Sequence, residues 1–235
     1  MHHSRLASAA RSLLRSAAWT LALAATGALP VVASAEAPAP AATPADGKVD
    51  EVLKRIQSKY EAVEVVQARF AQKSSSPLYG EAEQTGSLTV QRPKKMRWDF
   101  EGDGKQFISD GTTMWVYSKN DNQVIRYTDF GSQSSSADAI LQSMDKLGEL
   151  FDVTLLEGEG VVLGLVPKDE ASKAQVKSIR LGLSSELDLR EVVVTDAYDG
   201  VTTLSFETVT LGGSVAPDTF QFKVPEGAEV VDVSG

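Results

Sequence analysis

The sequence of 235 residues contains no cysteine, and its only two histidines are His2 and His3. Without cysteine the chain forms no disulfide bond and offers no thiol for an N-terminal lipid anchor. Once the first residues are removed no histidine remains, which excludes Ser-His-Asp and Cys-His nucleophiles and zinc sites built on histidine or cysteine. These absences exclude the commonest classes of hydrolase and zinc enzyme.

The first 35 residues also lack acidic side chains. They contain Arg5, Arg11 and Arg15, then an apolar run over 17–32, then Ala33-Ser34-Ala35. A basic start, an apolar centre and a small-residue cleavage site are the three parts of a secretory signal peptide. The alternative is an uncleaved anchor, but the run is shorter than the roughly 20 residues that span a bilayer. We therefore expect residues 1–35 to be cleaved near Ala35 and the protein to be exported.

The predicted cleavage leaves 20 basic and 32 acidic side chains. So acidic a protein is not expected to bind nucleic acid or an anionic membrane surface. Residues 36–47 are rich in proline and alanine and have no hydrophobic periodicity, which is typical of a disordered or extended tether. Residues 48–235 are then expected to form one domain with a sizeable core.

Two segments have apolar residues at helical spacing, and we expect each to form one amphipathic helix. The first contains Val49, Val52, Leu53, Ile56, Tyr60 and Val63, and the second, within 137–150, contains Ile140, Leu141, Met144, Leu147 and Leu150. A polar segment, 132–136, precedes the second helix and is a candidate hinge.

Most of the remaining chain alternates apolar and polar residues between closely spaced turns. The strand-like segments after the second helix are 161–166, 176–183, 189–195 and 201–211, followed by a last alternating segment with Phe220, Phe222 and Val224. Strands at hairpin spacing predict an antiparallel meander, either a barrel or a strongly curved sheet.

The most apolar part of this pattern is Gly86 to Tyr117, which contains Trp98 and Trp115. Met96, Trp98 and Phe100 alternate with Arg97, Asp99 and Glu101, so one face of the predicted sheet is strongly apolar. The pattern stops and restarts at Arg92-Pro93. An ordinary core and the wall of a cavity present the same apolar surface, and the alternation does not distinguish them.

Two short motifs invite enzymatic or metal-binding interpretations. Asp99, Glu101, Asp103 and Asp110 have spacings close to an EF-hand loop, but the flanking segments are strands and the bidentate glutamate is an aspartate. Ser143 to Lys146 fits S-x-x-K, but no K-T-G follows. We expect no bound metal, no cofactor and no catalytic residue.

An ordered set of motifs in this chain resembles the LolA family of periplasmic outer-membrane lipoprotein carriers. The motifs are Phe70-Ala71-Gln72, G-x-L-x-V-x-R-P over 86–93, Ser109-Asp110-Gly111, Met114 to Tyr117, and F-x-F-x-x-P-x-G over 220–227. The resemblance implies a mainly β fold, an incomplete, unclosed antiparallel β-barrel. Short helices cover it as a lid and enclose a hydrophobic cavity for lipoprotein acyl chains.

The resemblance also implies roles for individual residues. Arg92, followed by Pro93, is expected to hold the lid by hydrogen-bonding its backbone carbonyls; without the resemblance, a surface arginine before a turn proline is the simpler interpretation. The residues expected to line the lipid cavity are Phe70, Leu88, Val90, Met96, Trp98, Phe100, Trp115, Tyr117, Ile140, Leu141, Met144 and Leu147.

The partners implied by the resemblance are acylated lipoproteins as cargo, an inner-membrane ABC lipoprotein-releasing transporter and an outer-membrane lipoprotein receptor. The related receptor is lipid-anchored through an N-terminal cysteine, so the cysteine-free composition favours a periplasmic carrier, expected to be a monomer. Two alternatives stay open. One is a lipid-sensing regulatory domain of similar fold, and the other a histidine-independent hydrolase that uses Asp99, Glu101 or Asp110.

Overall fold

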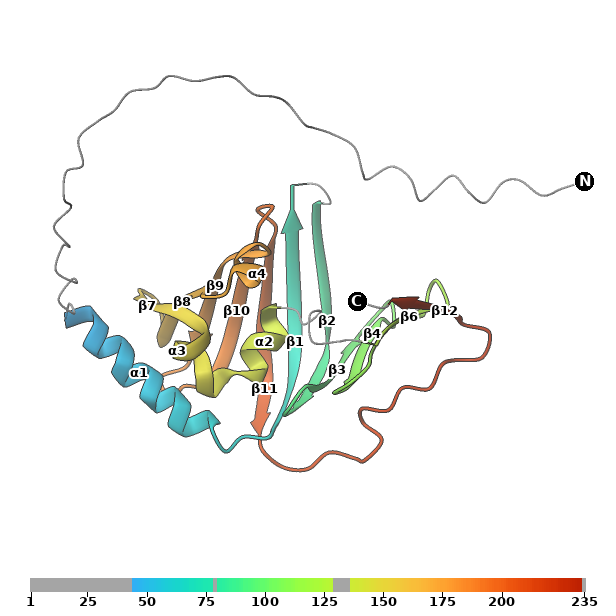
Figure 1. The fold of residues 1–235 in the computed structure, drawn as a ribbon, viewed down its shortest axis with the longest axis horizontal. Coiled ribbons are helices and arrows are strands. Elements are labelled where there is room, and N and C mark those ends of the chain that lie inside the picture. Colours follow the sequence, from blue (N-terminus) through green and yellow to red (C-terminus); the bar gives the residue numbers. More distant parts are fainter. Residues whose placement is uncertain (1–43, 78–79, 129–135, 234–235) are drawn as a thin grey trace, which may run out of the picture. The chain divides into compact units, whose positions relative to one another are not determined.

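The fold is organised around one twelve-stranded sheet in the computed structural model, which describes residues 44–77, 80–128 and 136–233 (Figure 1). Its strands are β1 (Val65–Ser76), β2 (Gly80–Gln91), β3 (Lys95–Phe100), β4 (Gln106–Asp110), β5 (Met114–Ser118), β6 (Gln123–Tyr127), β7 (Phe151–Leu156), β8 (Val161–Pro167), β9 (Val176–Leu183), β10 (Leu189–Asp196), β11 (Val201–Leu211) and β12 (Glu229–Val233). Their spatial order is β12-β6-β5-β4-β3-β2-β1-β11-β10-β9-β8-β7.

Every neighbouring pair in this sheet is antiparallel except β12 and β6, which are parallel. Strands β12 and β7 form the two edges and are not paired with each other within the described residues. This arrangement confirms the predicted mainly β, unclosed antiparallel fold. An unclosed sheet needs other elements to cover its apolar face.

Four helices supply that cover: α1 (Pro44–Tyr60), α2 (Ser136–Gln142), the 3-10 helix η2 (Met144–Lys146) and α3 (Leu147–Leu150). A further short helix, α4 (Glu170–Lys173), lies in the connection between β8 and β9 and buries no residue. The single helix expected over 137–150 is therefore wrong, because Ser143 and Lys146 leave helical backbone angles. The N–H groups of Ser143 and Lys146 donate to carbonyls three residues back, at Ile140 and Ser143, instead of four, so the segment breaks into short turns. We call residues 136–150 the lid segment.

The first helix begins at Pro44, inside the segment expected to be an extended tether. Proline suits the first turn of a helix because the N–H groups there have no intrahelical partner. The preceding residues of the expected signal peptide and tether, and most of the expected hinge at 132–136, lie outside the described residues. No helix in the described part is long and apolar enough to cross a bilayer.

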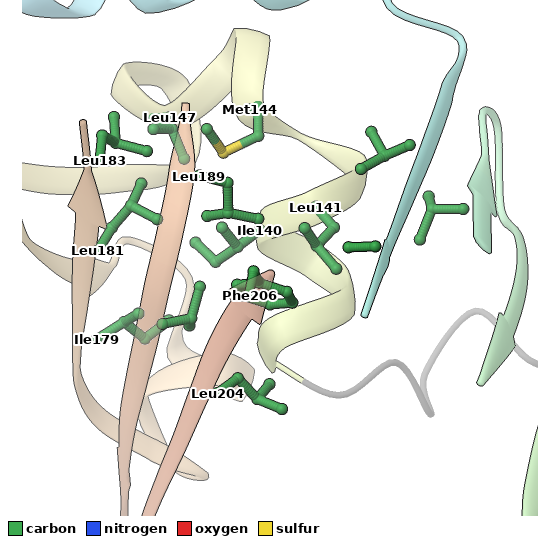
Figure 2. Close-up of a cluster of buried hydrophobic side chains, with 14 of the residues drawn as sticks. Ile140, Leu141, Met144, Leu147, Ile179, Leu181, Leu183, Leu189, Leu204 and Phe206 are labelled. Carbon is green, nitrogen blue, oxygen red and sulfur yellow. The ribbon is translucent and has the colours of Figure 1, made fainter. Parts of the chain in front are cut away.

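The lid segment packs its apolar side chains onto the sheet (Figure 2). Ile140, Leu141, Met144 and Leu147 are each at most 2% exposed. Figure 2 shows them facing side chains of β9, β10 and β11, among them Leu181, Leu189 and Phe206. Four of the five apolar residues of the second predicted helix thus belong to the core, whereas Leu150 is 43% exposed.

The last predicted strand, around Phe220 and Phe222, is also wrong. Residues 221–225 have no regular structure, and β12 forms further on. Instead this segment crosses the sheet: Arg97 Nη1 donates to the Thr219 carbonyl at 3.2 Å, and Asn122 Nδ2 donates to the Gly227 carbonyl at 2.9 Å. Side-chain anchoring therefore replaces strand pairing until the chain reaches β6.

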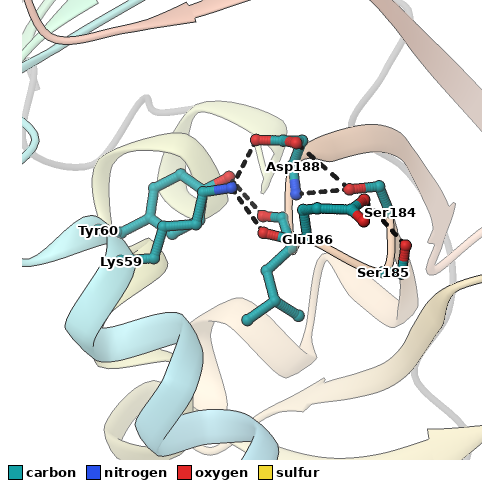
Figure 3. Close-up of polar contacts among 7 residues, drawn as sticks. Lys59, Tyr60, Ser184, Ser185, Glu186 and Asp188 are labelled. Atoms are coloured by element: carbon teal, nitrogen blue, oxygen red, sulfur yellow. Dashed lines mark hydrogen bonds and ion pairs between the residues drawn. The ribbon is translucent and has the colours of Figure 1, made fainter.

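A polar clasp joins the end of α1 to the turn between β9 and β10 (Figure 3). Lys59 Nζ donates to the Glu186 carbonyl at 2.7 Å and pairs with the Asp188 carboxylate, while the Tyr60 hydroxyl donates to the Leu187 carbonyl at 2.9 Å. Burial, and then the charge of Asp188, raise the pKa of Tyr60 to about 12. The clasp fixes one end of α1 independently of the lid segment.

The clasp predicts an alkaline loss of stability. Because the folded-state pKa of Tyr60 lies above its reference value of 10.0, the neutral phenol stabilises the fold below pH 10. That contribution is lost as the pH rises toward 12. The free energy of unfolding, measured with urea, should decrease between pH 9 and pH 11.5. The decrease should be about 1–2 kcal/mol larger in the wild type than in Tyr60→Phe. Equal decreases in both proteins would contradict a specific role for the phenol.

Candidate functional site

The turn between β2 and β3 is the point at which the sheet meets the lid segment. Along β2, Leu88 and Val90 point to the core, and Arg92 continues their alternation just beyond the end of the strand. Pro93 is exposed in the turn, and the peptide bond between Arg92 and Pro93 is cis. The alternation thus puts a guanidinium at the end of an apolar row.

The guanidinium of Arg92 is paired with a carboxylate of the lid segment. Its Nη1 lies 3.0 Å from Oδ1 of Asp145 in η2, and the two side chains are only 18% and 16% exposed. The other terminal nitrogen, Nη2, is buried and has no hydrogen-bond partner among the described residues. A partly buried ion pair is screened less by water than a surface pair, so it contributes to the packing of η2 against the turn after β2.

The contact differs from the expected hydrogen bond between Arg92 and lid carbonyls. The described contact is with the Asp145 side chain, a stronger acceptor than a carbonyl because it carries a full negative charge. Sequence reasoning missed Asp145, since it lies between apolar lid residues in the position of an ordinary solvated acid. Its only signal was its position beside Met144, on the segment expected to cover the sheet.

A second lid residue that sequence reasoning missed is Gln142, at the end of α2. The Lys94 N–H donates to Gln142 Oε1, and Gln142 Nε2 donates to the Lys95 carbonyl, both at 3.3 Å. One side-chain amide therefore bonds the backbone of the turn at two adjacent residues, and we call this pair of hydrogen bonds the Gln142 bracket. Nothing in the sequence marks this glutamine, because its partners are backbone atoms.

Ser109 on β4 supports the same turn from the sheet side. Its hydroxyl donates to the Lys94 carbonyl and accepts the Gly111 N–H, both at 3.1 Å, and the residue is fully buried. These bonds hold the turn rigidly enough to present Arg92, Lys94 and Lys95 to the lid segment.

Ten of the twelve residues expected to line the cavity share the apolar face of the sheet or the lid segment above it. Phe70, Leu88, Val90, Met96, Trp98, Ile140, Leu141, Met144 and Leu147 belong to the buried core, and Phe100 packs against it. Phe70 lies at the centre of an aromatic group, with ring centroids 4.9 Å from Trp98 and 5.1 Å from Phe100. Lid side chains and strand side chains therefore fill one shared apolar space.

Trp115 and Tyr117 do not share this face. Along β5 the core receives Met114 and Val116, so the intervening residues point to the opposite side of the sheet. There Phe222 covers both rings, with centroid distances of 6.1 Å to Trp115 and 5.9 Å to Tyr117. The expectation that Trp115 and Tyr117 line the cavity is therefore wrong. Sequence alone does not show which face of β5 is toward the core, because both faces carry apolar residues.

The acidic residues considered for hydrolysis have separate structural partners. Asp99 accepts two hydrogen bonds from Arg97 and one from Gln106. Hydrogen bonds from Thr85 and then Arg69 lower the pKa of Glu101. Partial burial raises the pKa of Asp110, but bonds from Thr113 and Thr112 outweigh that effect and lower it. A lowered pKa keeps Glu101 and Asp110 ionised, which makes them poor general acids.

The described residues contain no group of three or more potential metal ligands. They do form a groove of about 330 Å³ where α1 meets η2 and α3, and Leu53, Met144 and Asp145 are among its lining residues. The groove lies between α1 and the lid segment.

The family model described as outer membrane lipoprotein carrier protein LolA matches residues 61–223 of this chain. An outer-membrane lipoprotein carrier protein of Nitrosomonas europaea is 32% identical over 150 residues, covering 63% of this chain and 72% of the relative. The corresponding protein of Azotobacter vinelandii is 30% identical over 199 residues, covering 81% and 92%.

Among solved structures, an uncharacterised conserved protein of Thermus thermophilus aligns with a TM-score of 0.47 and 16% identity, covering 79% of this chain and 99% of that one. A LolA superfamily protein of Nitrosomonas europaea aligns with a TM-score of 0.43 and 13% identity, covering 74% and 97%. Family membership follows from the sequence matches alone.

The geometry predicts that Asp145→Asn loosens the lid segment. The substitution leaves the guanidinium of Arg92 without a counter-charge in a mostly buried position, which costs about 1–3 kcal/mol of stability. Hydrogen exchange should accelerate at the backbone amides of the lid segment and remain unchanged at the clasped end of α1.

The matched control is Asp232→Asn, which breaks an exposed ion pair with Arg126. An exposed pair contributes roughly 0–1 kcal/mol, so this variant should leave exchange in the lid segment unchanged. Equal lid exchange in Asp145→Asn and the wild type would show that the ion pair does not hold the lid.

Proposed function

Because this chain belongs to the LolA family of outer-membrane lipoprotein carriers, we propose that it binds the acyl chains of lipoproteins released from the inner membrane and delivers them to an outer-membrane receptor. The observation that supports the proposal is an apolar cover, the lid segment, which packs on an apolar sheet face and is joined to the turn after β2 by polar contacts. Carriage of this kind needs no catalytic residue and no cofactor in this chain.

The proposed binding surface is the shared apolar space beneath the lid segment. Burial of one lid side chain contributes about 1.5–3 kcal/mol, so the four buried residues contribute roughly 6–12 kcal/mol. A buried methylene contributes about 0.8 kcal/mol. Burial of about 8 to 15 methylenes therefore contributes as much free energy as the apolar contacts of the closed lid. Three acyl chains provide more methylenes than this.

The polar contacts at the turn have the opposite effect, because they favour the closed position of the lid segment. The Arg92–Asp145 pair and the Gln142 bracket form only when the lid segment lies on the sheet. When cargo occupies the space, both are lost, and their re-formation favours expulsion of the acyl chains. A carrier needs this balance, because it must take up its cargo and also release it.

The proposed cycle takes place in the periplasm after export and removal of residues 1–35, with residues 48–235 as the working domain and the protein as a monomer. An ABC transporter of the inner membrane loads the carrier and supplies the energy of ATP hydrolysis. The carrier transfers its cargo to a receptor that binds the acyl chains more tightly.

The decisive experiment incubates the purified mature chain with spheroplasts that contain an active transporter. We expect a triacylated lipoprotein to leave the membrane as a soluble one-to-one complex with the carrier. Arg92→Leu should form this complex but transfer its cargo to the receptor at least tenfold more slowly, because the closed state has lost its ion pair.

Arg69→Leu is the control, since Arg69 pairs with Glu101 on the outer surface, where both side chains are more than half exposed. It should load and transfer like the wild type. The carrier proposal fails if an active transporter yields no soluble complex, and the lid role of Arg92 fails if its leucine variant transfers normally.

The two tryptophans of the mature chain give a second test of the binding surface. Trp98 lies in the core beneath the lid segment, whereas Trp115 packs against Phe222 on the opposite face. An acyl chain brominated at its middle should quench the fluorescence of Trp115→Phe, in which Trp98 remains. Bromine quenches only at short range, so it should leave Trp98→Phe nearly unchanged. The reverse pattern would place the acyl chains on the other face of the sheet.

A further inference from the structure

The buried nitrogen Nη2 of Arg92 is a donor for which the closed protein provides no acceptor among the described residues. Leaving a buried donor unpaired costs about 1–3 kcal/mol, more if the group is charged. Such an atom in a folded protein calls for an explanation, and one explanation is an acceptor that arrives with a ligand.

The position of Arg92 restricts what that ligand is. Arg92 follows Leu88 and Val90 in the row that faces the core, and Met144 and Leu147 lie on either side of its partner Asp145. A ligand that reaches Nη2 therefore lies mostly among apolar side chains and brings one oxygen acceptor to the edge of the apolar space. A wholly apolar ligand would leave the donor unpaired.

An acyl chain has this composition, because by definition it begins at a carbonyl group. We propose that Arg92 is the binding site for an acyl carbonyl oxygen, so that cargo loading exchanges the carboxylate of Asp145 for a carbonyl of the cargo. This inference rests on the proposed function and adds a polar subsite to the apolar space.

The exchange couples lid opening to loading. When η2 leaves the sheet, the guanidinium loses the Asp145 carboxylate 3.0 Å from Nη1, and both terminal nitrogens then need an acceptor. Two parallel donors match a carbonyl oxygen, which has two lone pairs. A hydrocarbon displaces the lid segment without satisfying the guanidinium, whereas an acyl chain does both.

The test compares three probes of equal chain length: 1-decanoyl glycerol, 1-O-decyl glycerol and N-decanoyl ethanolamide. The ester and the amide carry a carbonyl, and the ether does not. Calorimetric titration of the mature protein should give a dissociation constant at least tenfold lower for the ester or the amide than for the ether, as one charge-assisted hydrogen bond provides. The carbonyl probe that binds more tightly shows whether the site prefers an ester or an amide linkage.

The variants separate the subsite from the lid. Arg92→Leu weakens the closed state and so changes the affinity for all probes together, but the ratio between ester and ether cancels that effect and should fall to about one. Arg92→Lys, which keeps a single charged donor, should give an intermediate ratio and guards against a leucine variant that does not fold. Asp145→Asn and Arg69→Leu should keep the wild-type ratio.

The outcomes distinguish the two proposals. If the wild type binds carbonyl and ether probes equally, or if Arg92→Leu keeps the preference, the carbonyl subsite is overturned while the carrier function stands. If the wild type binds none of the three probes, the apolar space does not accept acyl chains and both proposals fail.

Discussion

The unclosed sheet creates the constraint on which the rest of the structure depends. Its edge strands β7 and β12 do not pair with each other in the described chain, so its apolar face is not sealed by the sheet itself. Exposed apolar surface of that extent is unfavourable in water, at about 25 cal/mol per Å². The chain therefore has to cover the face with helices, and a cover made of short separate helices is easier to displace than a closed wall of strands.

The two helical covers are held in different ways. The end of α1 is clasped to the turn after β9 by Lys59 and Tyr60, whose bonds reach backbone carbonyls and a carboxylate. The lid segment is joined to the turn after β2 by one ion pair and one amide bracket, and to Lys168 by bonds at the carbonyls of Gly148 and Leu150. The proposed movement of the lid segment requires these contacts to break, whereas the clasp on α1 stays in place.

Much of the fold was predictable because it depends on local patterns. Alternating residues such as Met96, Trp98 and Phe100 define strands, and the spacing of Ile140, Leu141 and Met144 identifies a segment that buries one side. The ordered motifs identified the family and directed attention to Arg92. Predictions failed where one sequence pattern fits two structures. Strand β5 has apolar residues on both faces, so its pattern does not show which face is toward the core. The residues around Phe222 alternate like a strand, but they contact the sheet through side chains.

The sequence by itself determined an acidic, cysteine-free chain with an antiparallel sheet, two amphipathic segments and an arginine at the turn after β2, and it predicted export. Only the tertiary structure decided the partner of that arginine, the bracket at Gln142 and the face on which Trp115 lies. The physical reason is that these contacts join residues 47 to 107 positions apart in the sequence. Local periodicity describes which side of a segment is apolar, whereas the partner of a single guanidinium depends on where distant segments meet.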